Sequence, residues 1–190
     1  DNLPIMLSAT KHFMPGKVYR RERIKGFQWV IAGAPGIDKA MYGEVFAKSE
    51  ATRGVTVVYG ETYALLSHSY AAMVTSGTAT LETALFRVPQ VVCYYIPSGK
   101  FISWLRKKIL KVKYISLVNL IADKEIVQEL VADRMTLGNI IASLRDILPG
   151  GKGRETMLTE YERMNQILGG EGASQKAAQE MVSILKKNNI

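Results

Sequence analysis

The sequence predicts an α/β fold in which a parallel β-sheet is covered by helices on both faces. Short apolar, β-branched runs alternate with stretches in which apolar residues recur every three or four positions. The apolar runs carry few polar residues on either face, which is typical of strands buried inside a parallel sheet. Several of these runs stop at glycine, where a tight turn can lead into the next helix.

Five segments have the composition of strands. The first runs into the turn Gly33-Ala34-Pro35-Gly36, and the second stops at Gly60. The third leads into Ser76-Gly77, whereas the fourth precedes a Pro-Ser-Gly turn. The fifth is the shortest. The five predicted strands are residues 27–32, 55–59, 71–75, 91–95 and 114–117.

Helical spacing occupies much of the remaining chain. The first helix begins at residue 2 or 3, and a helix at that point of an α/β domain should follow a strand. The chain is therefore expected to be truncated at its N-terminus. Glycines at 169–172 separate the last helix from a domain expected over residues 1–168. That last helix, in residues 169–190, has an apolar face that must dock on this domain or on another. Further predicted helices are 62–69, 78–86, 101–111, 123–130, 136–148 and a stretch ending at 168.

Composition excludes several classes of protein. Of 190 residues, 47% are hydrophobic and 22% charged, which excludes a disordered chain and allows one domain with a core. The single cysteine, Cys93, lies in an apolar run, so an internal disulfide and a cysteine-based metal cluster are excluded. His12 and His68 have no Cys, His or carboxylate neighbours at ligand spacing, so no metal site is expected. No other cofactor is expected either. These features favour a protein of the reducing cytoplasm.

Positive charge is concentrated in one block, because residues 83–122 carry +7 of the net charge of +8. Within it, a basic amphipathic segment at 100–113 suits the surface of an anionic membrane. A helix that packs its apolar face on the sheet and leaves its charges in water is an equal alternative. The stretch 17–25 is also basic, but its pattern suggests no function. The residues expected to face the membrane are Phe101, Trp104, Arg106, Lys107, Lys108 and Lys111.

The strongest candidate site lies where the third predicted strand enters the next helix. Backbone N–H groups in the first turn of a helix attract phosphate, and Ser76 and Thr78 add hydroxyl donors. Gly77 lets a ligand approach the backbone, and Glu82 can accept hydrogen bonds from ribose hydroxyls. An ordinary helix capped by serine or threonine is the alternative. The P-loop, dinucleotide and hydrolase-elbow motifs are absent, and no acid–base pair identifies catalytic residues.

Other turns qualify by position, because ligands of open parallel sheets bind at the carboxyl ends of the strands. The turn at 33–36 is one, and Gly60-Glu61-Thr62 is another. Asn119 follows the last predicted strand, and its amide can both donate to a phosphate and accept from a hydroxyl. An ordinary turn is the alternative at all three places.

Three stretches resemble, in order and spacing, the C-terminal domain of the lipid-A-disaccharide synthases. Residues 75–82 read TSGTATLE, residues 88–95 read VPQVVCYY and residues 114–121 read YISLVNLI. The segment 27–36, with its Ala-Gly-Ala-Pro-Gly turn, is similar to the second strand of that family. The resemblance extends over essentially the whole chain.

This resemblance implies one half of a GT-B glycosyltransferase, in which two Rossmann-like domains face each other across a cleft. The family transfers a diacylglucosaminyl unit from a UDP donor to diacylglucosamine 1-phosphate without a metal. A peripheral position on the inner face of the cytoplasmic membrane, and a homodimer, are further expectations. By motif, the residues implied in donor binding are Ser76, Gly77 and Thr78 for the diphosphate, Glu82 for the ribose, Asn119 for the active-site side of the cleft, and, by fold position, Gly60, Glu61 and Thr62 for the uracil.

The chain departs from the family pattern in two respects. A Gly-Ser-Arg loop expected just before Asp1, and the N-terminal domain that holds the acceptor and a catalytic acidic residue, are not in the sequence. The chain alone is therefore expected to be inactive. Two alternatives remain: another GT-B enzyme of UDP-sugars, transferase or epimerase, and a non-catalytic basic module that binds nucleic acid. The second lacks any recognised nucleic-acid-binding signature.

Overall fold

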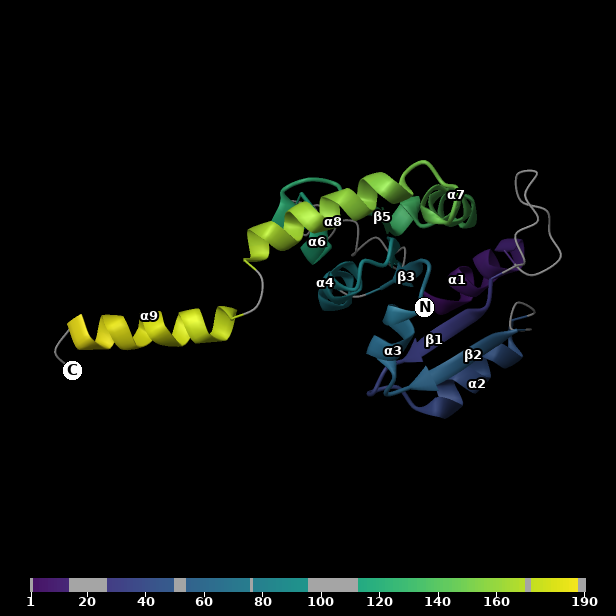
Figure 1. Cartoon of the computed structure of the whole chain (residues 1–190). Helices are drawn as coiled ribbons and strands as arrows, with labels where there is room; N and C mark the ends of the chain where they lie inside the picture. The colour runs from purple at the N-terminus through teal and green to yellow at the C-terminus, as the bar shows by residue number, and fades with distance from the viewer. Residues whose placement is uncertain are drawn as a thin grey trace.

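The computed structural model describes residues 2–13, 27–49, 54–75, 77–95, 113–169 and 172–187. It confirms the α/β fold class, with strands and helices alternating along the chain (Figure 1). The strands are β1 (Trp29–Gly33), β2 (Val55–Tyr59), β3 (Ala72–Val74), β4 (Gln90–Tyr94) and β5 (Gln128–Val131). The α-helices are α1 (Leu3–Thr10), α2 (Lys39–Ala47), α3 (Thr62–Ser67), α4 (Gly77–Leu85), α6 (Leu117–Ala122), α7 (Leu137–Ile147), α8 (Arg154–Leu168) and α9 (Ala173–Lys187), with 3₁₀ turns η1 (Lys11–Phe13) and η2 (Ala132–Arg134).

All strand pairs are parallel, but the described strands form two sheets. One sheet pairs β1 with β2, and the other has the order β3-β4-β5. The two sheets meet just before β1 and β3, where the rings of Phe27 and Tyr70 pack edge to face at 6.4 Å. Among the described strands, β1 and β3 are each paired on one side only, so each is an edge strand of its sheet.

The core surrounds β4. Successive residues of a strand point to opposite faces, and Val91, Val92 and Cys93 are all buried. Both faces of this sheet are therefore covered, as the apolar run predicts. Helices α4 and α7 both pack against β4. The burial also raises the pKa of the Cys93 thiol to about 12, so this cysteine is an inert core residue.

Two predicted elements are wrong. The predicted strand at 114–117 is a loop that enters α6, with Ser116 as its N-cap. The predicted helix at 123–130 is a loop followed by β5, which pairs with β4. Asp123, with φ of 45°, ends α6 in the left-handed conformation, which breaks the helix at that point. A short apolar run fits a strand or a buried helix equally well, and here tertiary pairing decides.

The other helical predictions agree with the structure to within a few residues, and a further helix, α2, begins at an Asp38 cap. Helix α8 ends at Gly169, whose φ of 77° suits a glycine C-cap. Beyond it, α9 stands away from the rest of the molecule (Figure 1). The predicted helix at 101–111 and the basic stretch at 17–25 lie outside the described residues.

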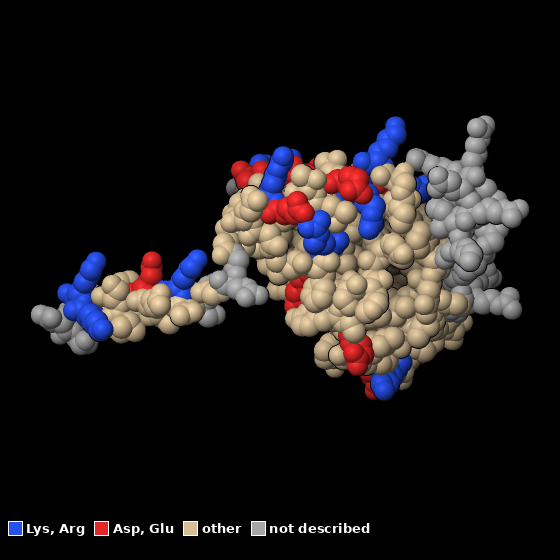
Figure 2. Space-filling model, in the orientation of Figure 1, with Lys and Arg blue, Asp and Glu red and all other residues tan. Residues whose placement is uncertain are grey.

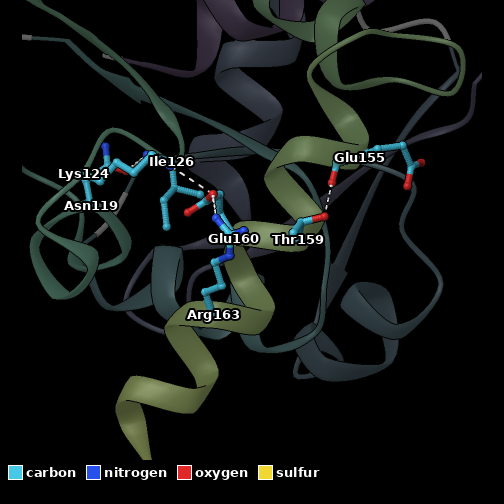
Figure 3. A network of polar contacts seen from close by, with 7 residues as sticks. All are labelled: Asn119, Lys124, Ile126, Glu155, Thr159, Glu160 and Arg163. Carbon is cyan, nitrogen blue, oxygen red and sulfur yellow. Dashed lines mark hydrogen bonds and ion pairs between the residues drawn. The ribbon is translucent and has the colours of Figure 1, made fainter.

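Ion pairs connect α8 to the loops that follow α4 and α6. Glu160 accepts from Lys124 at 2.9 Å and from Arg163 at 2.7 Å, and both side chains reach toward it in Figure 3. The hydrogen bond from Lys124 is the main cause that lowers the pKa of the Glu160 carboxyl. A further ion pair joins Arg87, in the turn after α4, to Glu162 of α8. Acidic and basic side chains alternate over this face of α8 (Figure 2).

Candidate functional site

Glycine is required at the carboxyl ends of β1 and β2, the edge of the sheet where the candidate site is expected. Gly60 has a φ of 75°, which L side chains rarely adopt, so the turn into α3 requires glycine. A Cβ on Gly33 would lie 2.3 Å from the ring of Tyr59, so that ring can pack across the end of β1 only because Gly33 has no side chain. The two glycines are thus required for different reasons, Gly60 by its backbone conformation and Gly33 by the close approach of the Tyr59 ring.

The turn after β3 presents an open helix start. Gly77 is the first residue of α4, and a Cβ built on it would meet no atom within 4 Å. Both Gly77 and Thr78 are exposed, whereas Ser76 lies outside the described residues. The first N–H groups of a helix have no partner inside it, and the helix dipole is positive there. This end of α4 therefore has both the space and the polarity that a phosphate needs.

Glu82 connects this helix to the turn at Gly60. It lies in α4, and Oε1 of its carboxylate accepts a hydrogen bond from the Tyr63 hydroxyl at 3.4 Å. Tyr63 is in the first turn of α3, directly after Glu61 and Thr62, which are both exposed. The fold thus brings together two groups of predicted site residues that are about twenty positions apart in sequence.

Tyr63 is a residue of this candidate site that the sequence pattern does not reveal. Its ring is stacked on Phe86, with centroids 5.4 Å apart and planes inclined by 22°. The signal available in the sequence was an aromatic residue directly after Gly60-Glu61-Thr62. One tyrosine in a helix is too common to indicate a site without knowledge of what faces it.

Asn119 occupies a different position from the one predicted, because it lies inside α6 and is completely buried. Its side-chain oxygen accepts from the backbone N–H of Ile126 at 2.7 Å, which Figure 3 shows, and from that of Val127 at 2.9 Å. Its amide nitrogen donates to the Val127 carbonyl at 2.8 Å and to the Glu129 carboxylate at 2.9 Å. This geometry gives Asn119 a structural role, since it joins α6 to β5.

Glu129 is the centre of this buried network and was also missed as a key residue. Its carboxylate accepts from the backbone N–H groups of Ile115 and Ser116, both at 2.9 Å, and from the Ser116 hydroxyl at 2.7 Å. Asn119 supplies a fourth donor. Buried carboxylates are tolerated when several donors surround them, so Glu129 fixes the loop that enters α6.

The start of α1 lies at the carboxyl end of β4. Oδ1 of Asn2 accepts from the backbone N–H of Tyr95, which follows β4, at 2.6 Å. Tyr94 and Tyr95 are 42% and 41% exposed. The beginnings of α1, α3 and α4 therefore lie beyond the carboxyl ends of strands, the edge at which open parallel sheets bind ligands.

Other predicted features are only partly described. Within the ranges that the structure describes, no group of three or more His, Cys, Asp or Glu side chains could hold a metal ion. In the same ranges, no helix combines the length and the apolar character needed to cross a bilayer. All six residues predicted to face the membrane, which are Phe101, Trp104, Arg106, Lys107, Lys108 and Lys111, fall in segments that are not described.

Comparison with known proteins gives one consistent family. The sequence pattern of the family described as lipid-A-disaccharide synthetase matches residues 20–184. A lipid-A-disaccharide synthase of Myxococcus xanthus is 33% identical over 97% of this chain and 48% of its own length. One of Syntrophus aciditrophicus is 30% identical over 98% of this chain and 46% of its own length. One of Psychromonas ingrahamii is 39% identical over 66% of this chain and 32% of its own length.

The chain thus spans about half the length of the first two of these curated relatives. The match to the family pattern covers most of the sequence, including every residue of the candidate edge from Gly33 to Glu82. The α/β architecture and the predicted resemblance agree with it. On this evidence, the chain belongs to the lipid-A-disaccharide synthase family.

Proposed function

We propose that this chain provides the nucleotide-sugar-binding part of a glycosyltransferase of lipid A biosynthesis. The observation that carries the proposal is the contact between Tyr63 and Glu82, which links the residue after the turn 60–62 to α4, the helix that begins at Gly77. Membership of the lipid-A-disaccharide synthase family supports the class of reaction. The position of both turns at the carboxyl ends of parallel strands supports a nucleotide as the ligand.

Each part of a UDP-sugar has a counterpart at this edge. The diphosphate lies at the start of α4, where Gly77 leaves the backbone accessible and Ser76 and Thr78 add hydroxyl donors. The Glu82 carboxylate is an acceptor for ribose hydroxyls, because an ionised carboxylate accepts and does not donate. The uracil lies beside the turn of residues 60–62. Asn119 is not assigned to the donor, because its side chain is fully bonded in the core.

In the proposed reaction, a diacylglucosaminyl unit passes from its UDP donor to diacylglucosamine 1-phosphate, and UDP leaves. The contribution of this chain is to bind the donor and to stabilise the charge that develops on the departing diphosphate. The N–H groups and dipole at the start of α4 supply this stabilisation without a metal. The acceptor site and the catalytic base are proposed to lie in the half of the relatives' length that this chain does not span.

The donor and acceptor are both acylated, and this motivates a second part of the proposal. The basic block at 83–122 holds the enzyme at the cytoplasmic face of an anionic membrane, where acylated substrates reside. Each Lys or Arg near such a surface contributes about 1 kcal/mol. Binding to vesicles containing anionic lipid should therefore weaken when Lys107, Lys108 and Lys111 are replaced by glutamine. Unchanged binding would remove this block from the membrane contact.

UDP binding to the full-length gene product tests the donor site. Calorimetric titration of the wild-type protein should show one UDP site, and Glu82→Ala should weaken it about tenfold while the melting temperature is preserved. Glu44→Ala in α2 is a matched control, because it removes an exposed helical carboxylate elsewhere. An unchanged UDP affinity in Glu82→Ala would remove this residue from the site. Epimerisation of a UDP-sugar without transfer would favour the alternative enzyme class.

A further inference from the structure

Tyr63 lies in the first turn of α3, directly after the Gly60-Glu61-Thr62 turn, and contacts the second half of α4 through Glu82. Its ring is fixed on one side by the stack on Phe86, and its hydroxyl is fixed by the hydrogen bond to Glu82. A tyrosine that is 59% exposed would otherwise sample several rotamers in water. Two contacts, one with Glu82 in α4 and one with Phe86 directly after α4, therefore hold this exposed side chain in one orientation.

Among the described residues, the Tyr63 hydroxyl is the only side-chain group that hydrogen bonds to the Glu82 carboxylate. A carboxylate offers about four acceptor positions on its two oxygens. Tyr63 takes one position on Oε1, so Oε2 and part of Oε1 stay available. Two neighbouring hydroxyls, such as those of a ribose, match this arrangement because each donates one hydrogen bond to a single carboxylate.

We propose that Tyr63 is a positioning residue, which holds the Glu82 carboxylate in the orientation that receives the ribose hydroxyls. This inference rests on the proposed role of Glu82 in donor binding. A free glutamate side chain loses rotamer freedom when it binds a ligand, and a side chain already held by a neighbour loses less. Tyr63 thereby increases the affinity for a ribonucleotide without contacting the reacting atoms.

The substitution Tyr63→Phe tests this role, because it removes the hydroxyl and keeps the stack on Phe86. In the full-length gene product we expect the affinity for UDP to fall roughly 3- to 10-fold, which corresponds to the rotamer freedom that a Glu82 side chain no longer held by Tyr63 must lose on binding. The KM for the donor should rise by a similar factor with little change in kcat. Tyr70→Phe is the control, since Tyr70 is 62% exposed and contacts Phe27 on another part of the fold.

A comparison of UDP with 2′-deoxy-UDP separates positioning from a merely structural role. If Tyr63 orients Glu82 toward the ribose, Tyr63→Phe should reduce the preference for UDP over 2′-deoxy-UDP, because one of the two oriented hydroxyls is absent from the deoxy ligand. A loss of fold stability would weaken the binding of both ligands by the same factor. An unchanged preference in Tyr63→Phe, with weaker binding of both ligands, would overturn the positioning role.

A double-mutant cycle then distinguishes this inference from the proposed function. In a Glu82→Ala background, Tyr63→Phe should cause no further loss of UDP affinity, because its effect passes through Glu82. If Glu82→Ala weakens UDP binding and Tyr63→Phe does not, the inference about Tyr63 fails and the donor site stands. If neither substitution changes the affinity for UDP, the ribose role of Glu82 fails as well.

Discussion

Replacing Gly77 by alanine should stabilise the fold but weaken the binding of UDP. Because the two effects have opposite signs, this substitution separates ligand binding from stability. Apart from its chain neighbours and the backbone of its own helix, a Cβ at Gly77 meets no atom within 4 Å, so the protein itself accommodates the methyl group. Alanine is favoured over glycine by up to about 1 kcal/mol in a helix interior, partly because it restricts the unfolded chain, and at the first residue of a helix this value is an upper limit. In a domain of this size, about 1 kcal/mol corresponds to an increase of about 2–4 °C in melting temperature.

The same methyl group would occupy the space that the diphosphate needs at the start of α4. We expect Gly77→Ala to weaken UDP binding at least about tenfold, or about 1.4 kcal/mol. Thermal unfolding and calorimetric titration of one preparation measure both effects. Gly138→Ala is the matched control, because Gly138 is exposed in the first turn of α7, beyond β5, with no atom within 4 Å of its built Cβ. A Gly77→Ala protein that is more stable and binds UDP unchanged would refute the diphosphate site.

Three further substitutions test the structural reasoning. Asn119→Ala leaves buried backbone groups of the α6–β5 loop without partners, and chemical denaturation should show a loss of about 2–4 kcal/mol in unfolding free energy; lost UDP binding at full stability would instead return Asn119 to the donor site. Gly33→Ala should lower the melting temperature, because its Cβ would strike the Tyr59 ring, and an unchanged value would contradict that packing. Because Lys124 lowers the pKa of Glu160, this carboxylate stabilises the fold above its usual pKa of 4.5 and less as the pH falls below it. The stability difference between wild type and Glu160→Gln should therefore shrink in acid, and a constant difference would argue against the ion pair.

The fold class could be predicted because the signal is local and repeated. The apolar residues of β4 identify a strand covered on both faces, and Thr136 marks the start of α7 as its N-cap. Residues 114–131 could not be assigned in this way. There, Asn119 and Glu129 use side chains to bond the backbone of a loop, and such bonds leave no periodic pattern in the sequence.

The candidate site was predictable to the extent that it consists of turns. Gly60 and Gly77 mark strand-to-helix junctions, and in the structure they follow the carboxyl ends of β2 and β3. Tyr63 was not predictable, because its importance depends on facing Glu82 from another helix. Asn119 is predicted at the donor site, but the structure shows its side chain bonded inside the core, and a buried amide and a ligand-binding amide have the same identity in sequence.

The most direct test of the central claim is an assay of the full-length gene product with the proposed substrates. UDP-diacylglucosamine and diacylglucosamine 1-phosphate should give a disaccharide and one equivalent of UDP. Glu82→Ala should raise the KM for the donor about tenfold more than that for the acceptor, because this chain is proposed to bind the nucleotide. A folded protein that forms no disaccharide, or a Glu82→Ala variant that affects only the acceptor, would contradict the assignment of the donor site to this chain.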